Sequence, residues 1–459
     1  MPDLPSQVSP ADHRPFTETA ELDRFPLSLH QDLLRGMDHG DGSGPFGPRY
    51  TIVGGWRIQG ELDLVILRSA LFDVVERHEA LRSSIVLAEQ PYHRLLRPSQ
   101  PDLQIRELSA PAGDRDSVAE QFLNDVEAGP FGLDEQPLIR AVLGRFDSHD
   151  HVLVLIAHHT AVDGWSIHRV LHDLATFYTA NREHRMPDLP PARQYREYVA
   201  WQQANLDSPE IRAAREFWRQ ELASGQLVGL PIDHRRSGEP FVTGWHRFIL
   251  GTDFNAATLK LASETRSTPF MVLLAAYLVY LRELTGVTDL IVATFTPGRW
   301  PAWVQDTVGA FYNLIPIHTD ITGCDTFRDV IDRTRASCIA AYAHEIPFEF
   351  IAEEAPTLLD AAMSEQAAVA VFQVTQSPLM MMTGERFGDL TYRAIRRRVQ
   401  SAPVGSQLPD GMLWGLELNP DGEILGSVGY TTNVLTEPTV QRMTAEFCQV
   451  LQDNILNGS

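Results

Sequence analysis

The sequence HVLVLIAHHTAVDGWS, residues His151–Ser166, places a run of apolar residues directly before a cluster of polar ones. The run His151–Ala157 lacks the alternation of apolar and polar residues that a half-exposed strand shows. It therefore predicts a strand that is covered on both faces, in the middle of a sheet. After a short loop, apolar residues recur at helical spacing and predict a helix from about Trp165 to Thr179. We expect the polar residues between the two elements to lie at the end of a central strand.

Two histidines follow this strand, and they cannot both serve one site. Adjacent residues on an extended segment point to opposite faces, so only one of His158 and His159 faces a given site. The other points into a core, where its ring nitrogens need partners. This geometry argues against a metal site shared by the two rings. A neutral imidazole at a strand end, facing a cleft, suits a general base near pH 7.

Asp163 and Gly164 lie where the chain turns from strand to helix. A carboxylate in such a turn can accept backbone N–H bonds or pair with an arginine. Glycine permits a backbone shape or a close approach that a side chain would block. The alternative interpretation is structural, with two hydrogen-bonded core histidines and an ordinary helix cap. That alternative is favoured for a bare pair of histidines, whereas the full HHxxxDG pattern after an apolar strand favours a reaction site.

The rest of the chain predicts two lobes of mixed helices and strands. With 459 residues, 44% of them hydrophobic, the chain is long enough to bury two cores without disulfides or metals. A proline-rich break at Glu183–Arg193 (EHRMPDLPPAR) separates the halves. We expect an α/β fold of layered sandwiches, with an N-terminal lobe at residues 1–185 and a C-terminal lobe at residues 186–459. Expected helices of the second lobe are Asn255–Glu264, Pro269–Leu284, Asp325–Tyr342 and Glu437–Leu451; expected strands are His246–Leu250, Leu290–Phe295, Asn313–Thr319, Ala367–Val374, Met412–Leu418 and Ile424–Tyr430.

Charge and composition argue against several classes of partner. The 38 basic and 60 acidic residues give a net charge of −22, which nucleic acid or an anionic membrane would repel at long range. The longest apolar stretch, Phe270–Leu284, is interrupted by Arg282 and Glu283 and is too short to span a bilayer. The first residues show neither the basic start nor the apolar run of an export signal. We therefore expect a cytoplasmic protein, whose free thiols are Cys324, Cys338 and Cys448.

HHTAVDG, residues His158–Gly164, resembles the HHxxxDG motif of condensation domains of non-ribosomal peptide synthetases, within the chloramphenicol acetyltransferase-like superfamily. Other segments resemble further motifs of this family in the same order along most of the chain. They are SLHQDLL (Ser28–Leu34), RHEALRS (Arg77–Ser83), YREYVAW (Tyr195–Trp201), Phe217-Trp218, LPID (Leu230–Asp233), TPGR (Thr296–Arg299), VGAFYN (Val308–Asn313) and HEIPFE (His344–Glu349). QSPLM (Gln376–Met380) is only a degenerate match to the penultimate motif.

The resemblance implies two lobes in a V arrangement with a tunnel between them. The resemblance also implies a donor that is an acyl or aminoacyl thioester on the phosphopantetheine arm of a peptidyl or acyl carrier protein, and no permanently bound cofactor. A small amine or alcohol acceptor enters from the opposite mouth. Some members of the family act outside peptide synthesis, for example in enediyne antibiotic assembly. We expect a free-standing condensation enzyme of natural-product biosynthesis that forms an amide or an ester.

Carried over residue by residue, the resemblance makes His159 the base that deprotonates or orients the acceptor nucleophile. Asp163 is structural and pairs with Arg299, with Arg82 as the second choice. Gly164 places a backbone N–H near the developing oxyanion. The expected lining residues of the tunnel, for which a structural role is equally open, are Trp165, Ser166 and Asn313.

Several rivals share the fold. An epimerase-type domain typically continues its motif as DGVSW, whereas this chain reads DGWSI, and a heterocyclase has aspartates in place of the histidines. An acyl-coenzyme A donor presents the same pantetheine thioester as a carrier protein. A catalytically inactive docking domain is the rival from another class, and the intact motif argues against it. Arg396–Arg398 is a candidate docking surface for an acidic carrier, and Met380–Met382 a candidate tunnel lining; a solvated loop and core filler are the alternatives.

Overall fold

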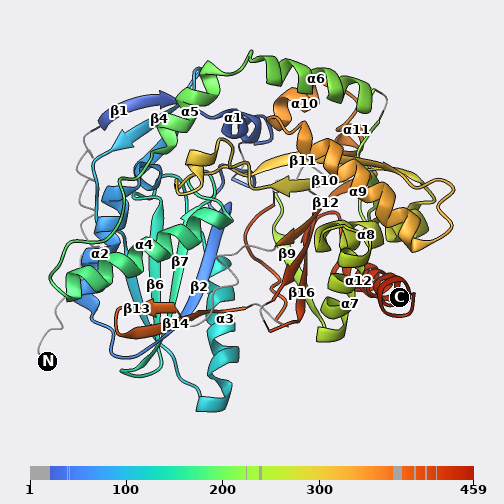
Figure 1. The fold of residues 1–459 in the computed structure, drawn as a ribbon. Helices are drawn as coiled ribbons and strands as arrows, with labels where there is room; N and C mark the ends of the chain where they lie inside the picture. The colour runs from blue at the N-terminus through green and yellow to red at the C-terminus, as the bar shows by residue number, and fades with distance from the viewer. Residues whose placement is uncertain are drawn as a thin grey trace, which may run out of the picture.

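The computed structural model describes residues 21–458 except residues 39, 41, 224, 237–239, 376–384, 397–399, 409–410 and 420. Two large sheets, each packed against helices, form two lobes that lie side by side in Figure 1. This arrangement confirms the predicted α/β class of layered sandwiches. Met380–Met382, Gln376–Met380, Arg397 and Arg398 lie outside the described residues.

The first sheet has six strands and holds the predicted central strand, β7. Its spatial order is β13 (Glu385–Phe387), β14 (Leu390–Ala394), β2 (Thr51–Gln59), β7 (Asp150–His158), β6 (Ile139–Arg145) and β5 (Leu103–Glu107). β7 pairs antiparallel with β2 on one side and with β6 on the other. Strand β7 is therefore hydrogen-bonded along both edges, as a central strand must be.

Helices cover both faces of this sheet, which explains why β7 is apolar throughout. Every residue of β7 is buried. Leu153, Leu155 and Ala157 pack into a core with α2 (Leu64–Arg77) and α4 (Gly164–Arg182). The alternate residues, Val152, Val154 and Ile156, pack against α3 (Arg115–Glu127) on the opposite face. The prediction of a strand covered on both faces is confirmed.

The second sheet forms the core of the other lobe. Its main order is β11 (Asn313–Asp320), β10 (Asp289–Thr296), β12 (Ala367–Thr375), β15 (Met412–Leu418), β16 (Ile424–Thr431) and β9 (Thr243–Leu250), and β8 (Gly229–Pro231) pairs with β12. The helices of this lobe include α6 (Pro209–Glu221), α7 (Thr252–Glu264), α8 (Pro269–Thr285), α9 (Phe327–Ala343), α10 (Phe348–Glu354), α11 (Asp360–Met363) and α12 (Glu437–Leu451). Helix α8 is the central one, since all its residues from 271 to 281 are buried. The helices and strands predicted for this lobe are all present.

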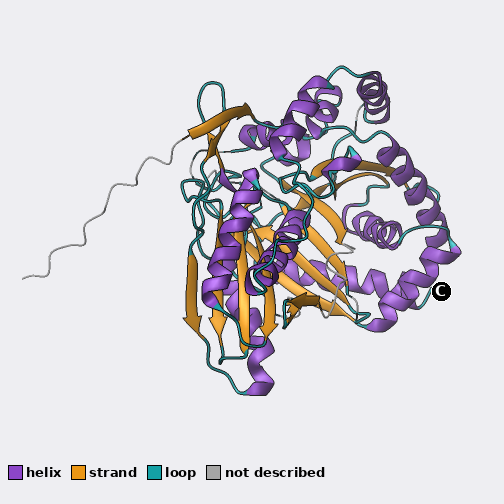
Figure 2. Ribbon diagram, turned by 60° about the vertical axis from the view of Figure 1, so that its left-hand side comes forward, coloured by secondary structure: helices purple, strands orange, loops and turns teal. Residues whose placement is uncertain are grey.

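Smaller elements complete the two lobes, and Figure 2 shows the strands of the fold with helices packed around them in a turned view. Helix α1 (Leu29–Gly36) contacts α10, and α5 (Tyr195–Ala204) packs beside the first core. A three-stranded sheet is formed by β1 (Glu21–Pro26), β4 (Tyr92–Leu96) and β3 (Ser83–Val86). Within the described residues no single helix has the length and apolar composition to cross a membrane; α7 and α8 meet those criteria only as a pair bent by 104°.

One segment of the second half of the chain crosses to the first lobe. β13 and β14 form a hairpin, and β14 pairs with β2, so both belong to the first sheet although they follow residue 384. Phe387 and Leu390 of this hairpin are buried in the first core. The division into residues 1–185 and 186–459 stays a prediction, and it did not include this crossing.

Candidate active site

His158 is the last residue of β7 and serves the interior of the first lobe. Its ring is fully buried, and Nε2 lies 3.2 Å from the carbonyl oxygen of Gly47. Nδ1 lies 2.8 Å from the hydroxyl of Thr160. The carbonyl can only accept, so Nε2 carries the proton and Nδ1 accepts from Thr160. Burial lowers the pKa of His158 to about 3, which keeps the ring neutral.

His159, the next residue, is half-buried and has the opposite tautomer. Its Nδ1 lies 2.9 Å from the carbonyl oxygen of Val162, so Nδ1 donates the hydrogen bond. The lone pair is therefore on Nε2, which has no hydrogen-bond partner among the described residues. Burial lowers the pKa of His159, while the hydrogen bond to Val162 opposes this shift. A neutral ring with one fixed N–H and one available lone pair is what a general base needs.

Two tyrosine rings pack against the ring of His159, and a third aromatic ring packs behind one of them. Tyr50 stacks on it at 4.9 Å between centroids, and Tyr312 packs at 4.6 Å on a tilted plane. The two tyrosine hydroxyls are hydrogen-bonded to each other. His30 of α1 packs edge-on against Tyr312 at 4.1 Å. These rings restrict the orientation of His159 and bring residues from three distant parts of the chain to one point.

Asp163 caps helix α4 and connects the two lobes. Its Oδ1 accepts a hydrogen bond of 2.6 Å from the backbone N–H of Ser166, as an N-cap carboxylate does. Arg299 Nη2 lies 2.8 Å from Oδ1 and 3.0 Å from Oδ2. The side chains of Asp163 and Arg299 are 5% and 1% exposed, so this ion pair is shielded from solvent. Arg82, the second choice as partner, instead donates to the carbonyl oxygen of Leu96.

Arg299 also holds the loop of the second lobe that faces α4. Its Nη1 donates to the carbonyl oxygens of Val304 and Thr307, each at 2.8 Å. Gly298, directly before it, has a φ of +58°, and a Cβ at this position would lie 1.7 Å from the carbonyl oxygen of Phe311. Glycine is therefore required here, both by the backbone conformation and by the close approach of another backbone segment.

Gly164 is exposed at the first position of α4, and its surroundings are open. Apart from its chain neighbours and the backbone of its own helix, nothing in the described chain lies within 4 Å of where its Cβ would be, and its φ is outside the left-handed region. The chain itself therefore does not require glycine here, and the open space is available to a substrate. The first N–H groups of a helix have no partner within the helix and carry the positive end of its dipole.

The three residues expected to line a tunnel have different surroundings. Trp165 is half-buried, and its Nε1 donates to the carbonyl oxygen of Gln305 at 3.0 Å. Ser166 is fully buried, and its hydroxyl donates to the carbonyl oxygen of Gly309 at 2.8 Å. The side chain of Asn313 binds backbone atoms of residues 346 and 348. Their role as tunnel lining stays a prediction, while their hydrogen bonds hold the loops around the site.

The sequence did not single out Tyr50, Tyr312 or His30 as site residues. Two of them lie in segments that resemble family motifs, His30 in SLHQDLL and Tyr312 in VGAFYN. The available signal was therefore the position within a motif combined with a side chain that carries a hydroxyl or an imidazole. Tyr50 is placed by the pairing of β2 with β7 within the first lobe. The positions of Tyr312 and His30 depend on the packing of the second lobe and α1 against the first lobe, which local patterns do not describe.

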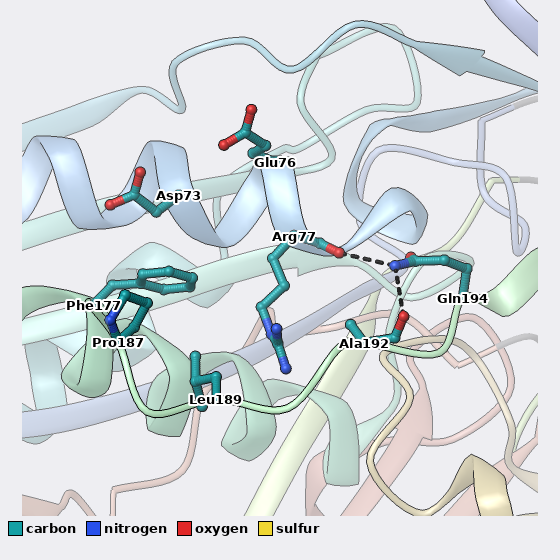
Figure 3. Close-up of a pocket in the computed structure, with 8 residues that line it drawn as sticks. All are labelled: Asp73, Glu76, Arg77, Phe177, Pro187, Leu189, Ala192 and Gln194. Carbon is teal, nitrogen blue, oxygen red and sulfur yellow. Dashed lines mark hydrogen bonds between the residues drawn. The ribbon is translucent and has the colours of Figure 1, made fainter. Parts of the chain in front are cut away.

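A separate hollow of about 330 Å³ lies away from His159, between α2, α4 and the segment of residues 187–194. Figure 3 shows Arg77 beside it and the amide of Gln194 hydrogen-bonded to backbone oxygens of Arg77 and Ala192. The hollow is lined by Asp73, Glu76, Arg77, Phe177, Pro187, Leu189, Ala192 and Gln194. None of these residues touches the ring of His159, so the hollow is not the reaction site.

Comparisons with known proteins identify relatives along almost the whole chain. The family model described as "Condensation domain" matches residues 47–459. Chondramide synthase of Chondromyces crocatus is 31% identical over 96% of this chain, and a probable non-canonical nonribosomal peptide synthetase of Salinispora arenicola is 31% identical over 93%. The chain spans 11% and 5%, respectively, of the lengths of these two relatives.

The SgcC5 protein of Streptomyces globisporus is among the similar solved structures. It is 40% identical, with a TM-score of 0.90, over 94% of this chain and 98% of that chain. That protein was solved in complex with (R)-(−)-1-(2-naphthyl)-1,2-ethanediol and sucrose. The first condensation domain of the calcium-dependent antibiotic synthetase is 19% identical with a TM-score of 0.74, over 95% of this chain and 98% of that chain, and shares the fold.

Proposed function

Because the chain belongs to the condensation-domain family, we propose that it transfers an acyl or aminoacyl group from a carrier-protein phosphopantetheine thioester to an alcohol, with His159 as the general base. The observation that carries this proposal is the state of the His159 ring. Its Nδ1–H is fixed on the carbonyl oxygen of Val162, which leaves Nε2 as a free acceptor. An acceptor hydroxyl placed on Nε2 would be oriented and deprotonated in one step.

The proposed reaction is an acyl transfer. The acceptor oxygen attacks the thioester carbonyl carbon while Nε2 of His159 takes its proton. The tetrahedral intermediate collapses, the carbon–sulfur bond breaks, and the departing sulfur receives the proton from His159. In this proposal the backbone N–H of Gly164, at the N-terminus of α4, stabilises the negative oxygen of the intermediate.

Asp163 and Arg299 act as positioning residues in this proposal. Their ion pair fixes the start of α4 relative to the loop of the second lobe, and Arg299 holds that loop by further hydrogen bonds. The hydrogen bonds of the Asp163 carboxylate go to Ser166, Arg299 and the backbone of Phe311 rather than to the ring of His159. Asp163 instead fixes the turn that contains Val162, the acceptor for Nδ1 of His159. The catalytic geometry therefore depends on a contact between the lobes.

An alcohol acceptor is favoured over an amine by one comparison. The SgcC5 protein, 40% identical to this chain, was solved with a bound 1,2-diol. The peptide synthetases among the relatives support the alternative, which is amide formation with an amine acceptor. A coenzyme A donor and a catalytically inactive docking domain are the remaining alternatives. The test below includes coenzyme A thioesters as donors, and an inactive docking domain would give no product from any donor.

The test is a reconstituted transfer assay. Carrier proteins loaded with different acyl and aminoacyl groups, or the corresponding coenzyme A thioesters, are incubated with a 1,2-diol or a primary amine, and products are followed by mass spectrometry. We expect ester from a carrier-bound donor and the diol, and a loss of about 10²- to 10⁴-fold in kcat for His159→Ala. A matched control is His172→Ala on the exposed side of α4, which should retain turnover.

Each other outcome selects a different function. Amide as the only product would replace the ester proposal with amide formation. Product only from coenzyme A thioesters would remove the carrier protein as donor. Near-normal turnover by a folded His159→Ala protein would contradict the role of His159 as base.

A further inference from the structure

Tyr312 belongs to the second lobe, but its ring packs among residues from the start of the chain. It lies directly before β11. Its ring packs at 4.6 Å from that of His159 and edge-on at 4.1 Å from that of His30 on α1. Its hydroxyl is hydrogen-bonded to that of Tyr50, which directly precedes β2. One side chain of the second lobe therefore contacts three rings that all precede residue 160.

The two tyrosines beside His159 are held in place by different contacts. The backbone N–H of His159 donates to the carbonyl oxygen of Tyr50 at 2.9 Å, as an extension of the pairing of β2 with β7. Tyr50 therefore lies beside His159 whenever this sheet is folded. Tyr312 reaches the ring through the loop of the second lobe, where the N–H of Phe311 donates to Oδ2 of Asp163 at 3.2 Å. Its contact with His159 depends on the docking of that loop.

The packing of the tyrosines restricts a motion that the hydrogen bond of His159 leaves possible. Nδ1 donates to the carbonyl oxygen of Val162, and a hydrogen bond tolerates a deviation of about 30° from linearity. A tilt of that size would move Nε2 on the far side of the ring. Tyr50 and Tyr312 pack against the ring and oppose the tilt. Within the described residues neither hydroxyl binds Nε2, so its lone pair stays available.

The tyrosines also help to keep water from the ring. The titratable groups that face His159 are Tyr50, Tyr312, His30, His158 and Asp163. Burial raises the pKa of both tyrosines and lowers the pKa of the two other histidines, so all four are neutral near pH 7. Burial lowers the pKa of His159, and the Asp163 carboxylate opposes this shift. The titration of His159 therefore reports how closely the neutral rings cover it.

We propose that Tyr312 is a positioning residue that holds the ring of His159 against Tyr50, and that the hydroxyl bridge between the two tyrosines makes this arrangement depend on docking of the second lobe. The kinetic part of this inference rests on the proposed function, whereas the state of the His159 ring can be measured without it. The inference adds to that function a direct link between lobe docking and the orientation of the base.

The first experiment measures the His159 ring without donor or acceptor. Protein with labelled histidines is titrated by NMR, and the His159 signal is identified by its loss in His159→Gln. We expect Tyr312→Ala to raise the titration midpoint of His159 toward 6.5, because water replaces the ring that covers it. Tyr312→Phe retains the ring and should keep the midpoint close to the native one.

Tyr195→Phe is the matched control for a general effect of lobe docking. The hydroxyl of Tyr195 donates to the carbonyl oxygen of Ala310 at 3.0 Å, so it also binds the loop that carries Tyr312. Its ring packs against other aromatic residues, among them Phe311. Tyr195→Phe should leave the midpoint of His159 unchanged. A rise as large as that in Tyr312→Ala would overturn the specific role of Tyr312.

A double-variant cycle tests the hydroxyl bridge in the proposed reaction. Tyr50→Phe and Tyr312→Phe each remove the bridge, and we expect each to lower kcat about fivefold with little change in KM. The double variant should be no slower than the single variants, because the bridge can be lost only once. Tyr312→Ala, which also removes the ring, should lower kcat by about tenfold or more. If Tyr312→Ala does not fold, the cycle tests the proposal by itself.

The outcomes distinguish this proposal from the proposed function. An unchanged midpoint of His159 in folded Tyr312→Ala overturns the positioning role, whatever reaction the enzyme catalyses. A loss in the double variant that equals the product of the two single losses overturns the bridge. If the native enzyme forms no ester but the midpoint rises as expected, the ester function is wrong and the positioning role of Tyr312 is supported.

Discussion

The two lobes contribute to the candidate site in different ways. The first lobe supplies residues 158–166, which form the end of a strand and the start of a helix. Their hydrogen bonds are mostly local: Nδ1 of His159 donates to Val162, and Asp163 accepts from the N–H of Ser166. The second lobe supplies a loop, residues 297–312, whose hydrogen bonds are long-range in sequence. Arg299 binds Asp163, 136 positions away, and Gly309 binds Ser166, 143 positions away.

The tautomer of the proposed base is therefore set within one lobe, whereas the position of the facing loop is set by the contact between the lobes. The base, His159, obtains its tautomer from its own turn and should keep it whenever the first sheet is folded. The facing loop has its position only when the lobes are docked, because Arg299 reaches across to Asp163. Conditions or substitutions that act on one lobe should therefore have different effects from those that act on the contact between the lobes.

Acid should have the largest effect, and it should destabilise the first lobe more than the second. Among the described residues, burial lowers the pKa of His30 and His158 to about 3 and of His93 and His168 to about 4. Below pH 6.5 the unfolded chain protonates these rings and the folded chain does not. The free energy of unfolding therefore decreases as the pH is lowered. The slope is about 1.4 kcal/mol per pH unit for each histidine down to about pH 4.

Protonation of Glu349 in the second lobe has the opposite effect on stability. Burial raises its pKa to about 7, so the folded state binds a proton as pH falls from 7 toward 4.5 and gains stability. Hydrogen exchange measured between pH 7.5 and 5 should show loss of protection in β7 before β16. Equal or reversed loss would contradict the assignment of the acid-sensitive groups to the first lobe.

Breaking the contact between the lobes should have the next largest effect. Arg299→Leu leaves the Asp163 carboxylate buried without its cation, and we expect a loss of about 3–5 kcal/mol in the free energy of unfolding. The measurement is urea denaturation, with turnover as a second readout. The double variant Arg299→Leu with Asp163→Asn should recover part of the stability, because no uncompensated charge remains. A single variant as stable as the native chain would show that the ion pair does not hold the lobes.

Two glycine substitutions give the smallest and most local comparison. Gly298→Ala forces a side chain onto the carbonyl oxygen of Phe311 in a left-handed conformation, and should cost about 1–3 kcal/mol. Gly164→Ala meets nothing within 4 Å and should change stability by less than about 0.5 kcal/mol. Under the proposed function Gly164→Ala should nevertheless slow turnover, because its methyl group enters the open space. Equal stability losses in the two variants, by thermal melting, would contradict this distinction.

The sequence alone predicted the parts of the site whose geometry is local. The apolar run of β7, the helix after it and the opposite orientations of His158 and His159 follow from periodicity, and the structure has all three. The choice of Arg299 as the partner of Asp163 came from the resemblance of TPGR to a family motif, because no spacing rule connects residues so far apart.

What was not predicted depends on how the lobes pack. Tyr50 lies beside His159 because β2 pairs with β7 within the first lobe. The packing of Tyr312 against His159, and of His30 against Tyr312, instead depends on the docking of the second lobe and α1. The pairing of β14 with β2 was also missed, because the alternation of a short strand does not identify its partner.

The hairpin of β13 and β14 has a further consequence for expressing the chain as fragments and for its proteolysis. A fragment ending at residue 185 would lack both strands, and it would expose the part of its core that Phe387 and Leu390 now cover. The remaining fragment would carry an orphan hairpin with no sheet to join. If the halves are co-expressed as two polypeptides, they can form the native strand pairing only by associating. A protease that cleaves the segment between the lobes would likewise leave them held together by the pairing of β14 with β2.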